Sequence, residues 1–273
     1  MLSPGRAKKP KLELLDLPIF TRETLGLSGV NLSTDLLAGA DRARLESVRE
    51  RADRASCACL LLIESDMQPF GSEKNGPAAT ERMIKVVEAA QILGCSAAAV
   101  RIEAPDDDAV LLRVAARLRP VMERAEKLDI NLLVSPAKGL TLRPERVTEL
   151  LKKVGGFRIG TYPDFQTAAE SKDPAGYLHR LTPYATAVAA ATVKFVPKDA
   201  PAAPAGGDVA LEVLLEKGVV HQPYALKPLV DAVISVGYDG PLALDYRGTG
   251  DVTMALMISR DELLACIGDA NDD

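Results

Sequence analysis

The chain has 273 residues, of which 47% are hydrophobic and 26% charged, and its net charge is −5 at pH 7. This is enough apolar material for the core of one large α/β domain, whereas the acidic balance argues against a polyanionic partner such as a nucleic acid. The absence of Trp and the low aromatic fraction of 4% also argue against a platform that stacks bases.

The lack of an apolar signal segment and the placement of the cysteines both indicate the cytoplasm. The N-terminal stretch MLSPGRAKKPKLELL lacks the apolar segment of a secretory signal, and the longest apolar runs, ACLLLI and ATAVAAATV, are too short to cross a membrane. The four cysteines form no CxxC pair and lie in apolar segments, which favours reduced, buried thiols over a zinc site. We therefore expect a cytoplasmic protein without a membrane partner.

Apolar runs of strand length alternate with amphipathic helical stretches along the chain. The helix over 41–55, for example, repeats Leu45, Val48, Ala52 and Ala55 at three- and four-residue spacing. In chain order, the pattern predicts a strand at 29–33, a helix at 41–55, a strand at 58–64, a helix at 80–93, a strand at 97–103, a helix at 107–128, a strand at 130–135, a helix at 144–156, strands at 157–162 and 187–195, a helix at 224–237, a strand at 241–246 and a helix at 253–267.

The strands are nearly continuous hydrophobic runs, as expected for parallel strands that are buried on both faces. Their alternation with helices indicates βα units. We predict a single (β/α)₈ TIM-barrel domain over residues 1–273, with seven visible strands and room for only a rudimentary first strand before Leu14. The stretch 197–208, PKDAPAAPAGGD, has no periodicity and is expected to be a flexible loop of the barrel.

Active sites of such barrels lie at the carboxyl ends of the strands. The polar residues that the predicted strands place there are Ser33, Glu64, Asp66, Arg101, Glu103, Ser135, Lys138, Asp164, Gln166, Lys194, Asp245 and Arg247. Ala190, Thr192 and Lys194 share one face of the predicted strand 187–195 because side chains alternate along a strand, so Lys194 is expected to point into the barrel. Arg101 and Glu103 have like parity and either contact a polar ligand or pair with each other, and we favour the pairing.

The chain resembles a known family, most strongly from Asn131 onward. The closing segment GYDGPLALDYRG is similar to the "GYdGplslEyeG" of the xylose isomerase-like TIM barrels (sugar phosphate isomerases and epimerases, in the endonuclease IV-like superfamily), and YPDF is similar to their "vDfgN". The likeness runs from about residue 12 to residue 267. It implies a xylose isomerase-like barrel, a carbohydrate-like ligand and, in many family members, a homo-oligomer.

The resemblance also implies a divalent-metal site, from which this sequence departs. The family holds one metal with a Glu, an Asp, a His and a Glu from its last four strands, and the metal polarises a sugar carbonyl while a glutamate moves the proton. The corresponding positions here are Ser135, Asp164, Ala190 and Asp245. Two aspartates could hold Mn²⁺, Mg²⁺ or Zn²⁺ only weakly.

Two functions therefore stay open. One is a sugar isomerase or epimerase with a degenerate metal site and weak or no activity in the family reaction. The other is a non-catalytic member of the fold that binds a sugar, a sugar acid or a protein. For the first, the candidate catalytic residues are Asp164, Asp245, Glu103, Lys194 and Glu64. For either, the candidate ligand-binding residues are Ser135, Lys138, Gln166, Arg101 and Arg247.

Overall fold

The computed structural model describes residues 12–198 and 218–271, without the side chains of 269–271. The expected rudimentary first strand and most of the expected loop at 197–208 lie outside these residues. The chain divides into two compact units. In the described residues, the five-stranded unit comprises 12–163 and 180–187, and the C-terminal unit comprises 164–179, 188–198 and 218–271.

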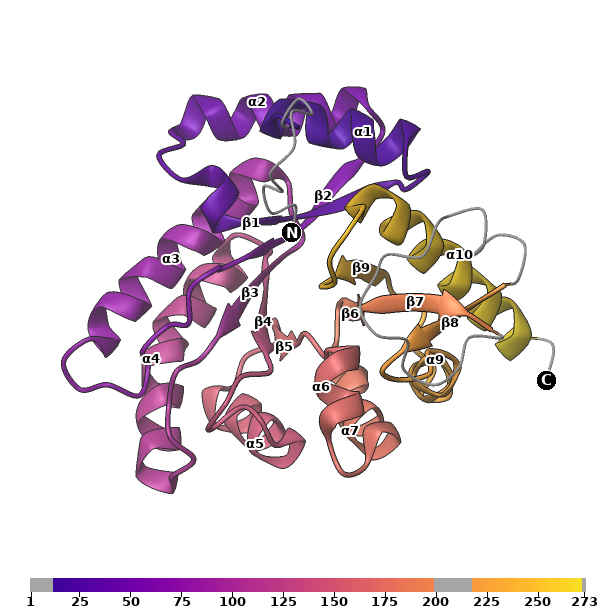
Figure 1. Ribbon diagram of the computed structural model, residues 1–273. Helices are drawn as coiled ribbons and strands as arrows, with labels where there is room; N and C mark the ends of the chain where they lie inside the picture. Colours follow the sequence, from indigo (N-terminus) through magenta and orange to yellow (C-terminus); the bar gives the residue numbers. More distant parts are fainter. Residues whose placement is uncertain (1–11, 199–217, 272–273) are drawn as a thin grey trace. The chain divides into compact units, whose positions relative to one another are not determined.

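The five-stranded unit is built on one parallel sheet in which neighbours in sequence are neighbours in space (Figure 1). Its strands are β1 (Gly29–Ser33), β2 (Ala58–Ile63), β3 (Ala97–Arg101), β4 (Asn131–Ser135) and β5 (Ile159–Thr161). Leu62, Val100 and Leu133 are completely buried in it, as the continuous apolar runs predict. The five strands that the sequence predicts between 29 and 162 are confirmed.

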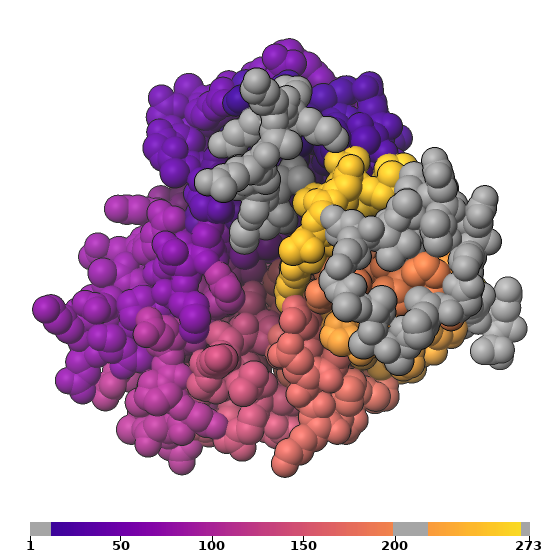
Figure 2. Space-filling model, viewed as in Figure 1, coloured from indigo at the N-terminus to yellow at the C-terminus, as the bar shows by residue number. Residues whose placement is uncertain are grey.

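One helix precedes β1 and one follows each of the strands β1 to β4, and their apolar faces cover the sheet. They are α1 (Leu17–Glu23), α2 (Arg42–Arg54), α3 (Gly76–Leu93), α4 (Asp108–Lys127) and α5 (Pro144–Val154), with short 3₁₀ turns η1 (Leu14–Asp16), η2 (Thr34–Leu37) and η3 (Thr182–Tyr184). Aspartates cap two of them, because Asp41 accepts from the Arg44 amide at 2.9 Å and Asp107 from the Val110 amide at 3.0 Å. Figure 2 shows the residues of α2 to α5, in purple to magenta, forming a continuous outer surface of this unit.

The C-terminal unit contains two separate strand pairs. Strand β6 (Val188–Thr192) is parallel to β9 (Leu242–Tyr246), and β7 (Lys194–Pro197) is antiparallel to β8 (Val219–Gln222). The helices are α6 (Phe165–Glu170), α7 (Pro174–Leu181), α9 (Lys227–Ile234) and α10 (Val252–Asn271). The last two residues of α7 belong to the five-stranded unit.

One predicted strand is wrong in its extent. The run 187–195 is not one strand, since β6 ends at Thr192 and Lys194 begins β7. Val193 separates the two because its amide donates to His221 Nε2 at 2.8 Å, away from the β6–β9 ladder. Strand β8, which contains His221, was not predicted. The parity argument that placed Lys194 on the face of Ala190 therefore fails.

Two further expectations from the sequence concern membrane-spanning helices and the burial of the cysteines. Within residues 12–198 and 218–271, no helix combines the length and apolarity that a membrane span requires. Cys57, Cys59 and Cys95 are buried free thiols, as predicted, whereas Cys266 is half-buried. Burial raises the pKa of Cys59 to about 11.

Candidate functional site

The carboxyl edge of the five-stranded sheet gathers several of the predicted site residues. Arg101 and Ser135 are the last residues of β3 and β4 and lie side by side in the sheet register. Ser135 is buried. Arg101 donates to the backbone carbonyl of Ser65. The predicted pairing of Arg101 with Glu103 is wrong, since none of the ion pairs among the described residues joins them.

Glu64 lies just after β2 and is only 1% exposed. Its carboxylate accepts from Arg82 Nε at 2.8 Å, from Thr34 Oγ1 at 3.1 Å and from the Asp66 amide at 3.2 Å. Each of its two oxygens is therefore occupied by a partner of the same unit. This arrangement makes Glu64 a structural ion-pair partner of Arg82 and a poor candidate for proton transfer to a ligand.

Glu103 and Lys138 line an open cavity of about 730 Å³ in the five-stranded unit. The loops after β2, β3 and β4 form its walls and are joined by the bridges Gln68↔Ile102 and Ala104↔Gly139. Gly139 has a φ of 91°, and a Cβ there would lie 2.1 Å from the Ala104 carbonyl oxygen, so this close approach needs glycine. Both charged side chains are exposed, which leaves them free to meet a ligand from solution.

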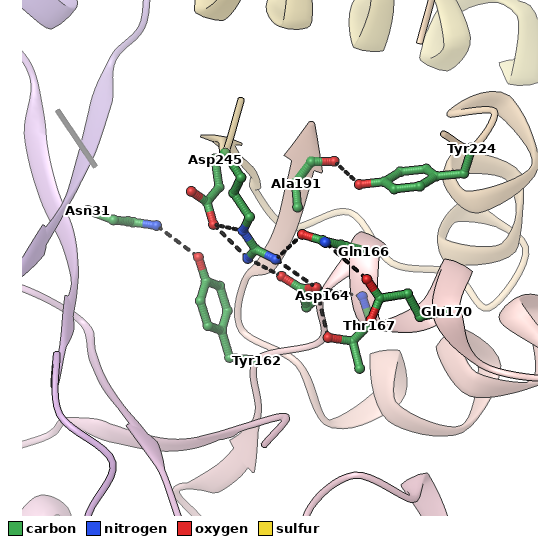
Figure 3. Close-up of polar contacts among 10 residues, drawn as sticks. Asn31, Tyr162, Asp164, Gln166, Thr167, Glu170, Ala191, Tyr224 and Asp245 are labelled. Carbon is green, nitrogen blue, oxygen red and sulfur yellow. Dashed lines mark hydrogen bonds and ion pairs between the residues drawn. The ribbon is translucent and has the colours of Figure 1, made fainter. Parts of the chain in front are cut away.

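A second set of predicted site residues forms one cluster in the C-terminal unit (Figure 3). We call Asp164, Gln166, Asp245 and Arg247 the Arg247 cluster. Arg247 Nη1 donates to Asp164 Oδ1 at 3.2 Å and to Gln166 Oε1 at 3.0 Å, and Nη2 bonds to Asp164 Oδ2. Arg247 Nε and Nη2 donate to Asp245 Oδ2 at 2.9 and 2.7 Å.

Regular backbone structure positions the cluster. Asp164 is the N-cap of α6, where its Oδ1 accepts from the Thr167 amide at 2.7 Å, and its backbone forms a bridge with Ala189 of β6. Asp245 is in β9, and Arg247 lies two residues further on the same face. The Arg247 amide donates to the Thr192 carbonyl at 2.8 Å and so extends the β6–β9 ladder by one residue.

Two acidic groups and one basic group give the cluster a formal charge of −1. The side chains of Arg247, Asp245 and Asp164 are 35%, 31% and 7% exposed, so the cluster is accessible at its Arg247 and Asp245 side. Burial lowers the pKa of Arg247, but the two aspartates more than offset this and raise the pKa above its usual range. The guanidinium is therefore a permanent cation between two carboxylates.

The residues present do not fit a divalent metal as they stand. A metal held by Asp164 and Asp245 would compete with Arg247 for both oxygens of Asp164 and for Oδ2 of Asp245. It would also meet a fixed positive charge within hydrogen-bond distance of both carboxylates. The other two positions that the resemblance assigns to ligands are Ser135 and Ala190, neither of which offers an anionic or imidazole donor. In the part of the chain that the structure describes, no three His, Cys, Asp or Glu residues are arranged to share a metal.

Three residues around the cluster were missed by sequence reasoning. Gln166 Nε2 donates to Glu170 at 3.0 Å, Thr167 Oγ1 donates to Asp164 at 2.9 Å, and Tyr224 donates to the Ala191 carbonyl at 2.7 Å (Figure 3). Thr167 and Glu170 could have been found from their spacing after the N-cap, whereas Tyr224 carries no such signal. Lys194 lies opposite Gln222 in the β7–β8 pair, and among the described residues it forms no hydrogen bond or ion pair with a member of the cluster.

Known proteins that are similar to this chain were found among solved structures only, and they identify its fold. No protein-family model matches the sequence, and no curated protein matches it. Similar solved structures do exist. L-ribulose 3-epimerase is 15% identical, with 94% of this chain and 90% of that chain covered and a TM-score of 0.71.

Two further similar structures are complexes with a ligand. A xylose isomerase-like TIM-barrel protein from Mycobacterium smegmatis in complex with magnesium is 14% identical over 94% of this chain and 89% of that chain, with a TM-score of 0.67. D-psicose 3-epimerase with D-tagatose, from Clostridium cellulolyticum H10, is 11% identical over 94% and 92%, with a TM-score of 0.66. Together with the parallel β-strands and covering helices, these matches show that the chain has the xylose isomerase-like (β/α)₈ TIM-barrel fold.

Proposed function

We propose that the chain binds a neutral carbohydrate of the ketose class at the Arg247 cluster, and that its activity in the metal-dependent sugar isomerase or epimerase reaction that the family resemblance implies is weak or absent. The observation that carries the proposal is the convergence of Asp164, Gln166 and Asp245 on one guanidinium. All four residues were predicted from sequence to lie at strand ends.

The chemistry of the cluster supports a sugar ligand. Carboxylates, an amide and a guanidinium offer several donors and acceptors in fixed directions, which is what recognition of adjacent hydroxyl groups requires. The formal charge of −1 disfavours a carboxylate or phosphate, so a neutral sugar is preferred over a sugar acid or sugar phosphate. The structural neighbours include epimerases of ketoses, one of them with D-tagatose.

Two of the positions that the resemblance assigns to metal ligands argue against the family reaction. Ser135 and Ala190 stand where the resemblance assigns a Glu and a His, and loss of a positioned base alone costs about 10²–10⁴-fold in rate. Residual isomerisation would have to use Glu103 or Lys194 for proton transfer. A weak isomerase is thus the alternative outcome of the experiment below.

The test is calorimetric titration of metal-stripped protein, in the presence of EDTA, with D-fructose, D-tagatose, D-psicose and L-ribulose. We expect saturable binding of at least one neutral ketose and weaker or no binding of the corresponding phosphates. Gln166→Ala should weaken the binding because it removes the side-chain carbonyl oxygen, which accepts hydrogen bonds, and the side-chain NH₂ group, which donates them. Gln91→Ala, on the exposed face of α3, is the matched control and should have no effect.

Two results would overturn the proposal. One is failure of every neutral ketose to bind at concentrations where a control epimerase is saturated. The other is epimer formation at a rate comparable to that of the control epimerase, which appears when Mn²⁺ is added and disappears with EDTA and so would mean a fully working metal site.

A further inference from the structure

We infer that the Arg247 guanidinium is a built-in replacement for a divalent cation, and that a latent metal site lies beneath it. The inference concerns the same cluster as the proposed function and rests on it to that extent, but it makes a separate claim. It states that removing Arg247 converts Asp164, Asp245 and Gln166 into metal ligands.

The donor set around the guanidinium is the kind that divalent ions prefer. Four oxygen atoms converge on its three nitrogens: both carboxylate oxygens of Asp164, Oδ2 of Asp245 and Oε1 of Gln166. Carboxylate and amide oxygens are the usual ligands of Mg²⁺, Ca²⁺ and Mn²⁺. One guanidinium bonds to all four oxygens, so a single positive group is their common partner.

The position of Arg247 is fixed by its backbone. Its amide is bonded to Thr192, and the next residue, Gly248, lies where an added Cβ would be 1.9 Å from the Val193 carbonyl oxygen. Only glycine fits at position 248, because the backbone passes so close to Val193. This close approach and the amide bond to Thr192 hold the Cα of Arg247 in place, which restricts where its side chain can reach. Unlike a metal ion, a cation supplied in this way cannot be removed by a chelator.

Of the residues that bond to Arg247, Asp164 would be affected most by its removal. It is only 5% exposed, and its Oδ2 has the guanidinium as its hydrogen-bond donor. A buried carboxylate without a counter-charge is costly. Removal of Arg247 also changes the formal charge of the cluster from −1 to −2, and both changes favour uptake of a divalent ion.

Arg158 provides a matched control. Its side chain is also 35% exposed, but its guanidinium pairs with a single carboxylate, that of Asp129 at 2.7 Å, and otherwise donates to the Asp129 backbone carbonyl at 3.3 Å. Arg158→Ala therefore removes an arginine of equal exposure without leaving a set of converging oxygens. It should create no metal site.

The experiment measures Mn²⁺ binding to metal-stripped protein by calorimetry, and by the electron paramagnetic resonance signal of free Mn²⁺. Wild type and Arg158→Ala should bind no Mn²⁺ below about millimolar concentration, whereas Arg247→Ala should bind one ion at least about tenfold more tightly. Adding Asp164→Asn to Arg247→Ala should abolish the gain. Arg247→Gln, which keeps a polar side chain at the position, serves as the second variant in case the alanine variant does not fold.

Each outcome is decisive. If both Arg247 variants are folded by circular dichroism and bind no more Mn²⁺ than Arg158→Ala, the inference is wrong. Mn²⁺ binding to wild type that Asp164→Asn removes would also overturn it, because the metal would then displace the guanidinium. Ketose binding by wild type in EDTA tests the proposed function independently, so failure of one claim can be told from failure of the other.

Discussion

The buried negative charge of Glu64 is compensated by one cation, the guanidinium of Arg82. It is almost fully buried, and its ion-pair partner Arg82 is half-exposed, with 47% of its side chain accessible. We predict that Arg82→Ala lowers the free energy of unfolding by about 2 kcal/mol, because it leaves a buried charge uncompensated. Solvent that enters in place of the guanidinium keeps the effect below that of a fully buried pair. Urea denaturation measures it.

An exposed ion pair supplies the comparison. Arg42 and Glu46 pair at 2.8 Å with side chains that are 75% and 50% exposed, and Arg42→Ala should cost no more than about 0.5 kcal/mol. Equal losses for Arg82→Ala and Arg42→Ala would show that Glu64 does not need its partner.

His221 is held in its neutral form. The Val193 amide must donate, so His221 Nε2 accepts and the ring proton lies on Nδ1, which bonds to the Tyr224 carbonyl at 2.7 Å. Burial lowers the pKa of His221 below its ordinary value of 6.5. The unfolded chain therefore takes up a proton before the folded chain does, and the stabilisation, complete above that ordinary value, is lost as the pH falls through the folded pKa.

We predict that the free energy of unfolding falls between about pH 7.5 and about pH 5.5 more steeply in wild type than in His221→Gln. The other histidine, His179, is exposed and bonds to Ser235. His179→Gln leaves His221 and its two hydrogen-bond partners in place, so it is the matched control and should keep the fall that His221 causes. A pH dependence that survives in His221→Gln and vanishes in His179→Gln would contradict the assignment.

Sequence reasoning found the members of the Arg247 cluster but not their pairing. Strand ends and the family resemblance pointed to Asp164, Gln166, Asp245 and Arg247 separately. Arg247 is 83 residues from Asp164 and 81 from Gln166, and no local pattern specifies a contact over that distance. The two-residue spacing of Asp245 and Arg247 on one strand face could have suggested their pair.

At the scale of elements, the apolar run 187–195 shows what periodicity cannot reveal. It contains no Gly, Pro or Asn that would mark a break. The strand ends because the Val193 amide bonds to a side chain 28 residues away. The helices were easier to predict, since their apolar stripes and caps are local, and α2 and α4 lie within a residue or two of the predicted bounds.

The bridge between the loops after β3 and β4 depends on one glycine. Gly139→Ala places a methyl group against the Ala104 carbonyl, which also accepts from the Leu140 amide at 2.9 Å. Gly237 has a similar φ of 78° but nothing within 4 Å of an added Cβ. We predict that Gly139→Ala destabilises the fold by at least about 1 kcal/mol more than Gly237→Ala, which measures the left-handed strain alone.

Urea denaturation of the two glycine variants decides the point. Because Gly139 adjoins Lys138 at the cavity of the five-stranded unit, a Gly139→Ala variant should also expose the loops around it to faster amide hydrogen exchange. Equal stability losses would mean that the loops yield without cost to the bridge.

At the scale of the whole molecule, the alternation of strands and helices was sufficient to predict the barrel class. Seven parallel strands occur among the described residues where seven were predicted, with the sixth shortened at Thr192. The antiparallel hairpin of β7 and β8 was not foreseen, because the valine pair of β8 is too short to stand out from a loop. That residues 1–273 form a single domain stays a prediction.

Chain connectivity supports that prediction. The division into two units falls between Pro163 and Asp164 and again inside helix α7. Asp164 is buried and caps α6, whereas true domain boundaries fall in exposed, flexible linkers. We therefore expect the two units to unfold in one cooperative transition.

Hydrogen exchange followed by mass spectrometry across a urea series tests this expectation. Peptides from β2 to β4 should lose protection at the same urea concentration as peptides from β6 and β9. Gly139→Ala, which perturbs only the five-stranded unit directly, should lower the midpoint of both sets equally. A shift confined to β2–β4 would mean that the units unfold independently, because the free energy lost in one would then not be felt by the other.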